Sequence, residues 1–161
     1  MKRIDKIQTD FEIVNTKIIT SVRLADLPDP VDLVVDCGAT MTTLSPQLFN
    51  DLGLSLKDKS PIKILGINSE EKSFSTLIPA FTIGGKNLGE VRIALGTMRE
   101  EFQDKVILGM NIPGWFNFDV SISNKVLELR PRFGGNFEII GNGFKEKTPT
   151  IGLILSEINA E

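Results

Sequence analysis

The sequence predicts an all-β domain built from many short strands and one short helix. Apolar, often β-branched runs recur along the chain between glycine, proline and asparagine turn signals. Only residues 45–53 carry start and stop signals typical of a helix. A length of 161 residues suits one domain with a core of its own. Together these observations favour a barrel or a closed sandwich.

The first third of the chain contains two predicted strand regions and the helix. Residues 10–24 alternate loosely between apolar and polar side chains, which predicts a long strand or a strand pair. Two prolines make residues 27–30 a turn, and the apolar run 31–35 reads as a buried strand. Residues 45–53 begin with a serine N-cap and a proline and end at a glycine, which predicts a helix over 47–52.

The rest of the chain repeats short strands and turns. Strands are predicted over residues 61–65, 73–83, 87–95, 106–108, 116–122 and 125–129. Gly84-Gly85 predicts a tight hairpin turn, residues 96–105 a charged loop, and residues 111–115 a turn or one helical turn. The pattern weakens after Arg130, and residues 151–158 fit a strand or a helix equally well.

Composition excludes several classes of function. The net charge of −3, with both signs spread along the chain, predicts neither a nucleic-acid nor an anionic-membrane partner. No signal peptide or membrane-length apolar run is expected. Cys37 is the only cysteine, which excludes an intrachain disulfide and favours a reducing, cytoplasmic setting. Because the chain has no histidine, carboxylates would have to transfer protons if it is a hydrolase.

The predicted strand 31–35 is followed directly by a carboxylate, Asp36, which is the main candidate for a functional residue. Asp36 follows this apolar run without a cationic neighbour, and burying such a group is costly unless it has a partner or a task. Cys37, Gly38, Ala39 and Thr40 complete the turn, in which the glycine permits a close backbone approach. An ordinary turn aspartate is the other interpretation.

A second Asp-x-Gly sequence serves as an internal comparison. Asp51-Leu52-Gly53 has the same residue types, but its aspartate lies on the predicted helix and its glycine ends that helix. Only the Asp36 copy has an apolar strand before it and Ala-Thr after it.

The segment from Leu33 to Thr40 resembles the active-site segment of retropepsin-like aspartic peptidases, where Asp precedes Thr or Ser, Gly, and Ala or Ser. A second mark of that family is a pair of apolar residues followed by glycine. Here it is Ile107, Leu108 and Gly109, with Asn111 two residues further on.

The resemblance covers roughly residues 10–130 and implies a closed retropepsin-like β-barrel. It implies a domain over residues 1–130, and we expect residues 131–161 to be a C-terminal extension packed on it. Gly66, Ile67 and Asn68 stand where the family carries its substrate-binding flap. A plain hairpin tip is the other interpretation of these three residues.

The resemblance also implies a mechanism and a stoichiometry. Such enzymes use two aspartates, and this chain offers only Asp36, so each chain would hold half a site. A symmetric homodimer would then hydrolyse an extended peptide or protein substrate with the two Asp36 carboxylates and an activated water. No metal or cofactor is implied.

Cys37 is the chief departure from the family, where a Thr or Ser hydroxyl bonds the partner loop. A thiol is a weaker donor, and without histidine it makes a poor nucleophile. A catalytically weak or inactive dimeric module that binds peptides or proteins is therefore the alternative function. A monomeric barrel with a structural Asp36 is a third.

Overall fold

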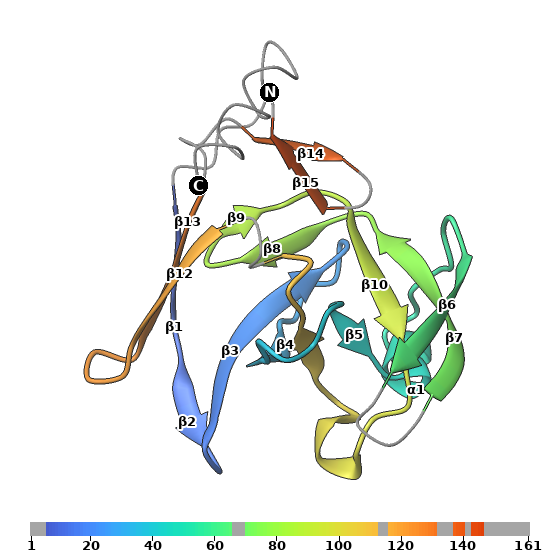
Figure 1. Ribbon diagram of the computed structural model, residues 1–161, viewed down its shortest axis with the longest axis horizontal. Coiled ribbons are helices and arrows are strands. Elements are labelled where there is room, and N and C mark those ends of the chain that lie inside the picture. Colours follow the sequence, from blue (N-terminus) through green and yellow to red (C-terminus); the bar gives the residue numbers. More distant parts are fainter. Residues whose placement is uncertain (1–5, 66–69, 113–115, 132–136, 141–142, 147–161) are drawn as a thin grey trace.

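The computed structural model describes residues 6–65, 70–112, 116–131, 137–140 and 143–146. Strands dominate this part of the chain, and its one α-helix is the short α1, Pro46–Asp51 (Figure 1). A single 3₁₀ turn, Glu100–Phe102, lies within the predicted charged loop. The predicted mostly-β class with one short helix is therefore confirmed.

The strands are short, as the punctuated apolar pattern predicts. In chain order they are β1 Ile7–Asp10, β2 Glu12–Val14, β3 Lys17–Leu24, β4 Val31–Val35, β5 Thr43–Leu44, β6 Ser60–Leu65, β7 Glu70–Ile78, β8 Phe81–Ile83, β9 Lys86–Asn87, β10 Val91–Leu95, β11 Val106–Leu108, β12 Phe116–Ser121, β13 Val126–Pro131, β14 Phe137–Ile140 and β15 Gly143–Glu146.

A ten-stranded sheet forms the body of the molecule. Its order is β6-β7-β10-β5-β11-β4-β3-β8-β9, with β2 paired to β3. Most neighbours are antiparallel, but β11 runs parallel to β4 and β10 runs parallel to β5. Among the described residues, the end strands β6 and β9 of this sheet do not pair with each other. The closed barrel that the sequence predicts is therefore not confirmed.

Two smaller sheets accompany this body. β1, β13 and β12 lie together on one side of the molecule, opposite the β6–β7 hairpin (Figure 1). β14 and β15 pair with each other. Residues 147–161, including the ambiguous segment 151–158, lie outside the described residues, and the expected packing of the extension stays a prediction.

The helix forms for the local reasons that the sequence indicates. The Ser45 hydroxyl accepts a hydrogen bond from the Leu48 N–H at 3.0 Å, and Pro46 occupies the first turn. Gly53 follows the helix with φ +66°, a backbone conformation that favours glycine. Leu48 and Phe49 bury the inner face of the helix in the core.

The long strand predicted over residues 73–83 is wrong. The structure divides it into β7 and β8, and Pro79, which cannot donate to a ladder, lies at the break. The predicted Gly84-Gly85 turn is confirmed, with both residues at positive φ between β8 and β9.

The long strand predicted over residues 87–95 is also wrong. Gly89, at φ +76°, lies between β9 and β10. Leu88 is fully buried there, and its N–H donates to Phe81 O at 2.8 Å. β9, before this bend, pairs with β8, whereas β10, after it, pairs with β7.

The region predicted as one strand or a strand pair, residues 10–24, belongs to β1, β2 and β3. Buried Phe11 separates β1 from β2, and Asn15 and Thr16 at positive φ form the turn between β2 and β3.

One apolar core joins the large sheet, the helix and the β1–β13 pair. Its members are aliphatic and aromatic side chains with little or no exposed surface. They include Ile7, Leu24, Leu33, Leu44, Ile78, Phe81, Ile83, Leu88, Ile93, Leu108, Ile112 and Leu129. The core holds β4 and β11 in place, and the loops that follow these two strands meet.

Candidate active site

Asp36 lies immediately after β4, and its carboxylate is exposed in the single chain. Its N–H donates to Leu108 O of the neighbouring β11 at 3.3 Å. Its Oδ1 accepts a hydrogen bond from the Gly38 N–H at 2.8 Å. A Cβ on Gly38 would lie 3.2 Å from that same oxygen, so glycine leaves the carboxylate room to receive this bond. A strand-ending loop thus presents an acid to solvent.

The second predicted loop lies directly beside the first. Leu108 aligns with Val35 in the parallel β4–β11 pair, and Gly109 follows. A Cβ on Gly109 would lie 2.1 Å from the carbonyl carbon of Met41, so no other residue fits without a backbone shift. The Met110 N–H then donates to Ala39 O at 2.8 Å. The structure therefore brings together the two segments that the sequence singles out.

A buried side-chain network ties these loops to each other. Thr42 has no exposed surface, and its hydroxyl accepts from the Gly109 N–H at 3.2 Å and donates to Asn111 Oδ1 at 2.8 Å. Asn111 Oδ1 also accepts from the Thr42 N–H at 2.7 Å, and its Nδ2 donates to Arg92 O of β10 at 2.9 Å. The Asn111 N–H donates to Thr40 O at 3.0 Å. These bonds fix the two loops and β10 as one unit.

Sequence reasoning noted Asn111 beside Gly109 but missed Thr42. The only local signal for Thr42 is a hydroxyl residue shortly after an Asp-x-Gly turn, which is common on protein surfaces.

The remaining residues of the Asp36 loop differ in exposure. Cys37 and Thr40 are exposed, and Ala39 is partly buried. Met110, in the adjoining loop, is 38% exposed. The thiol that follows Asp36 in the sequence and the Met110 side chain of the adjoining loop are therefore both on the surface of the single chain.

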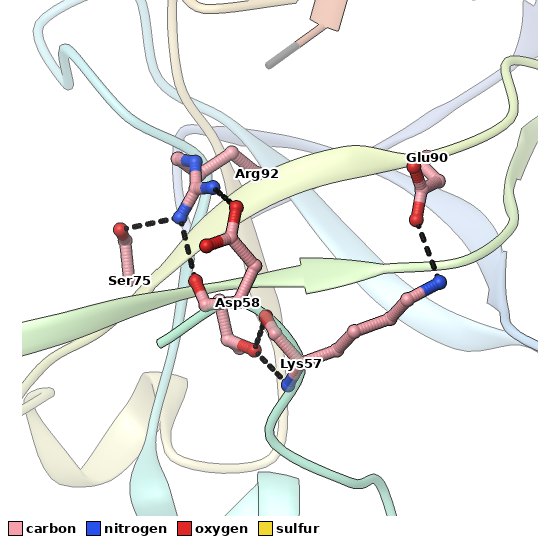
Figure 2. Close-up of polar contacts among 6 residues, drawn as sticks. Lys57, Asp58, Ser75, Glu90 and Arg92 are labelled. Atoms are coloured by element: carbon pink, nitrogen blue, oxygen red, sulfur yellow. Dashed lines mark hydrogen bonds and ion pairs between the residues drawn. The ribbon is translucent and has the colours of Figure 1, made fainter. Parts of the chain in front are cut away.

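The candidate flap residues Gly66, Ile67 and Asn68 lie outside the described residues. The hairpin that leads to them is β6–β7, and its base is fastened to β10 (Figure 2). Arg92 on β10 donates to Ser75 Oγ at 3.0 Å and to Asp58 O at 3.1 Å, and it forms an ion pair with the Asp58 carboxylate.

The charged groups near the start of β11 lie at the other end of the β4–β11 pair from Asp36. The Lys105 ammonium bonds Asp104 at 2.9 Å and lies 3.9 Å from an Asp32 oxygen. The hydrogen bond from Lys105 lowers the pKa of Asp104. Because both carboxylates are largely exposed, this group contributes little to stability.

The described residues contain neither a metal-binding cluster nor a membrane-spanning helix. No group of three or more histidine, cysteine, aspartate or glutamate side chains is placed to hold a metal ion in this part of the chain. No helix described in the structure is long and apolar enough to cross a membrane.

Comparisons with known proteins agree with this geometry. Residues 20–112 match the family model for aspartyl proteases, and this match spans both the Asp36 loop and the Gly109 loop. No curated protein matches the sequence.

Two solved structures resemble the chain at low sequence identity. A retropepsin-like aspartic protease from Rickettsia conorii has 20% identity and a TM-score of 0.57, over 78% of this chain and 90% of that one. EIAV protease complexed with the inhibitor HBY-793 has 21% identity and a TM-score of 0.46, over 61% of this chain and 86% of that one. The first likeness shows a retropepsin-like fold. Since the family model matches more than half of the sequence, the chain belongs to the aspartyl protease family.

Proposed function

We propose that the protein is a homodimeric aspartic endopeptidase with Asp36 contributed by each subunit. One observation carries the proposal. Asp36 is exposed at the end of β4, and the loop bonded to it, Gly109 to Asn111, contains no carboxylate. A single chain therefore supplies one acid where acid–base hydrolysis without histidine needs two.

A two-fold dimer would supply the second acid from the same loop of the partner. Two carboxylates about 3–4 Å apart repel by roughly 4 kcal/mol at an effective dielectric constant near 20. This repulsion is enough to keep one proton shared between them.

In the proposed reaction, the ionised Asp36 takes a proton from a water molecule, which attacks the scissile carbonyl carbon. The protonated Asp36 donates a hydrogen bond to the carbonyl oxygen and stabilises the charge that develops there. The C–N bond then breaks as the amide nitrogen receives a proton from the pair, which completes hydrolysis with one water consumed.

The surface around Asp36 supports assembly through this loop. Cys37 is exposed and Met110 is 38% exposed beside the Asp36 turn. A partner subunit would cover both side chains, and burial of the methionine would favour association.

The edge of the large sheet supports an extended peptide as substrate. β6 stands at the end of the ladder, and among the described residues it pairs only with β7. An edge strand offers unpaired backbone groups with which an extended peptide forms hydrogen bonds.

The test compares the two Asp-x-Gly aspartates. Asp36→Asn should abolish cleavage of a mixed peptide library while leaving the chain folded and able to bind peptide, because the amide keeps the shape and loses the proton chemistry. Asp51→Asn is the matched control, since Asp51 is exposed on α1 and should leave cleavage unchanged. Equal cleavage by the Asp36→Asn variant and the wild type would refute the proposal.

Cys37 favours a second candidate function, a dimeric module that binds peptides or proteins and cleaves them poorly. The weak thiol donor would hold the paired loops less firmly than a hydroxyl. This candidate predicts peptide binding by the wild type and by Asp36→Asn, with cleavage by neither.

A further inference from the structure

The β6–β7 hairpin extends past the strand that supports it. β10 pairs with β7 only from Phe74 to Ile78, and β10 ends at Leu95. Beyond this ladder, Glu70–Ser73 of β7 pair only with β6 among the described residues. We call this part of the hairpin, residues 62–65 and 70–73, its outer half. A two-stranded hairpin is marginally stable by itself, so side-chain contacts must determine where the outer half lies.

The base of the hairpin is fixed by a dense group of polar contacts. Arg92 holds Ser75 and Asp58, and its side chain is only 16% exposed. Thr76, which is fully buried, donates to Lys57 O at 2.6 Å and accepts from the Lys57 N–H at 2.7 Å. Lys57 also forms an ion pair with Glu90 (Figure 2). Together with the ladder, these contacts make the base rigid.

In the part of the hairpin that the structure describes, the inner face of the outer half contacts residues at or just after the end of β10. The Glu71 carboxylate accepts from the Thr97 hydroxyl at 2.8 Å and from the Thr97 N–H at 3.3 Å. The Ser73 hydroxyl donates to Leu95 O. Opposite Glu71 in the hairpin is Ile64, whose Cδ1 would lie 2.8 Å from a Cβ on Gly96.

Among the contacts just described for the outer half, those of Glu71 involve a charged side chain. It binds both the side chain and the backbone of Thr97, and hydrogen bonds to an ionised group are the stronger kind. The neighbouring Glu70 lies on the opposite face, where it forms an exposed ion pair with Lys63 at 2.8 Å. Among the described residues, only Glu71 therefore ties the outer half of the hairpin through a carboxylate to the segment that follows β10.

We infer that Glu71 is a positioning residue, which holds the outer half of the β6–β7 hairpin against Thr97 while the Arg92 contacts hold its base. In the peptidase reaction, this contact determines the position of the β6 edge with which the extended peptide would pair. That part of the inference rests on the proposed function, whereas the attachment itself does not.

The first experiment measures attachment by amide hydrogen exchange in the full chain, without substrate. Glu71→Gln and Thr97→Val should each increase exchange about tenfold at residues 62–65 and 70–73, because each removes part of a charged hydrogen bond. Residues 75–78, which the β10 ladder protects, should not change. Glu70→Gln is the matched control and should resemble the wild type. Equal exchange in the Glu71→Gln and Glu70→Gln variants would overturn the inference.

The second experiment measures peptide cleavage. Glu71→Gln and Thr97→Val should raise KM severalfold with little change in kcat, and the double variant should be no worse than the more affected single variant. Additive losses or a loss confined to kcat would contradict a positioning role. If the wild type cleaves no peptide, or Asp36→Asn remains active, the proposed function fails, and the exchange result still decides the role of Glu71.

Discussion

Gly109 shows at the scale of one residue how backbone space positions the candidate site. Its missing side chain lets β11 and its loop lie against Met41, where a Cβ would be 2.1 Å from a carbonyl carbon. The nearest atoms are backbone, which cannot rotate away. This close approach keeps the Met110 N–H on Ala39 O, beside the Asp36 turn.

We therefore expect Gly109→Ala to lower the free energy of unfolding by about 2–4 kcal/mol, because the backbone must shift to admit the methyl group. Urea unfolding followed by circular dichroism measures this change. Gly53→Ala is the control, since nothing lies within 4 Å of its Cβ position and only its positive φ opposes alanine. It should cost about 1 kcal/mol. Equal losses in the two variants would contradict the steric argument.

Cys37 allows a test of the proposed assembly at a single side chain. Cys37→Thr restores a hydroxyl donor at an exposed position beside Asp36, and each new hydrogen bond across the dimer would contribute about 1 kcal/mol. The dissociation constant of the dimer should then fall about tenfold or more, as measured by analytical ultracentrifugation. Cys37→Val, which has a similar shape and no donor, should bring no gain.

At the scale of the elements, the decisive feature is the connection between the loops after β4 and β11. The buried Thr42 hydroxyl connects Gly109 with Asn111, and Asn111 continues the connection to β10. The two loops and β10 therefore move together, and β10 carries Arg92, which holds the base of the β6–β7 hairpin.

Thr42→Val keeps the shape of the side chain and removes this connection. We expect a loss of about 1–3 kcal/mol in the free energy of unfolding, because the Gly109 N–H loses a buried partner. Under the proposed function, cleavage should fall more steeply than stability predicts, since the Asp36 loop loses its fixed position. Thr43→Val is the control, because its partly buried hydroxyl donates only to Met41 O at 2.9 Å. A similar cost for both variants would show that the network has no special role.

At the scale of the whole molecule, the proposed site is incomplete in one chain. The activity per chain should therefore rise with protein concentration and level off when the dimer is fully formed.

Mixing subunits tests this directly. A tenfold excess of Asp36→Asn chains should reduce the activity of a fixed amount of wild-type protein roughly tenfold, because random pairing leaves few wild-type pairs. An excess of Asp51→Asn chains, which keep Asp36, should not inhibit. Activity that is independent of concentration and unaffected by the Asp36→Asn variant would identify an active monomer.

Features that depend on short stretches of chain were predictable from the sequence alone. The mostly-β class followed from apolar runs between turn residues, and α1 followed from Ser45, Pro46 and Gly53, whose effects are local. The Asp36 turn was recognisable because its residues are consecutive, and Gly109 because it ends an apolar run.

How distant segments meet was not predictable in this way, because it depends on the folded arrangement of the strands. The sequence predicted one strand where Pro79 separates β7 from β8, and one where the bend at Gly89 separates β9 from β10. Several contacts join residues that are well separated in sequence. They are the hydrogen bonds of Thr42 with Asn111, the ion pair of Arg92 with Asp58, and the hydrogen bonds of Glu71 with Thr97. No local propensity encodes such pairs, because their geometry depends on how the whole sheet packs and on which polar groups this packing leaves to be satisfied.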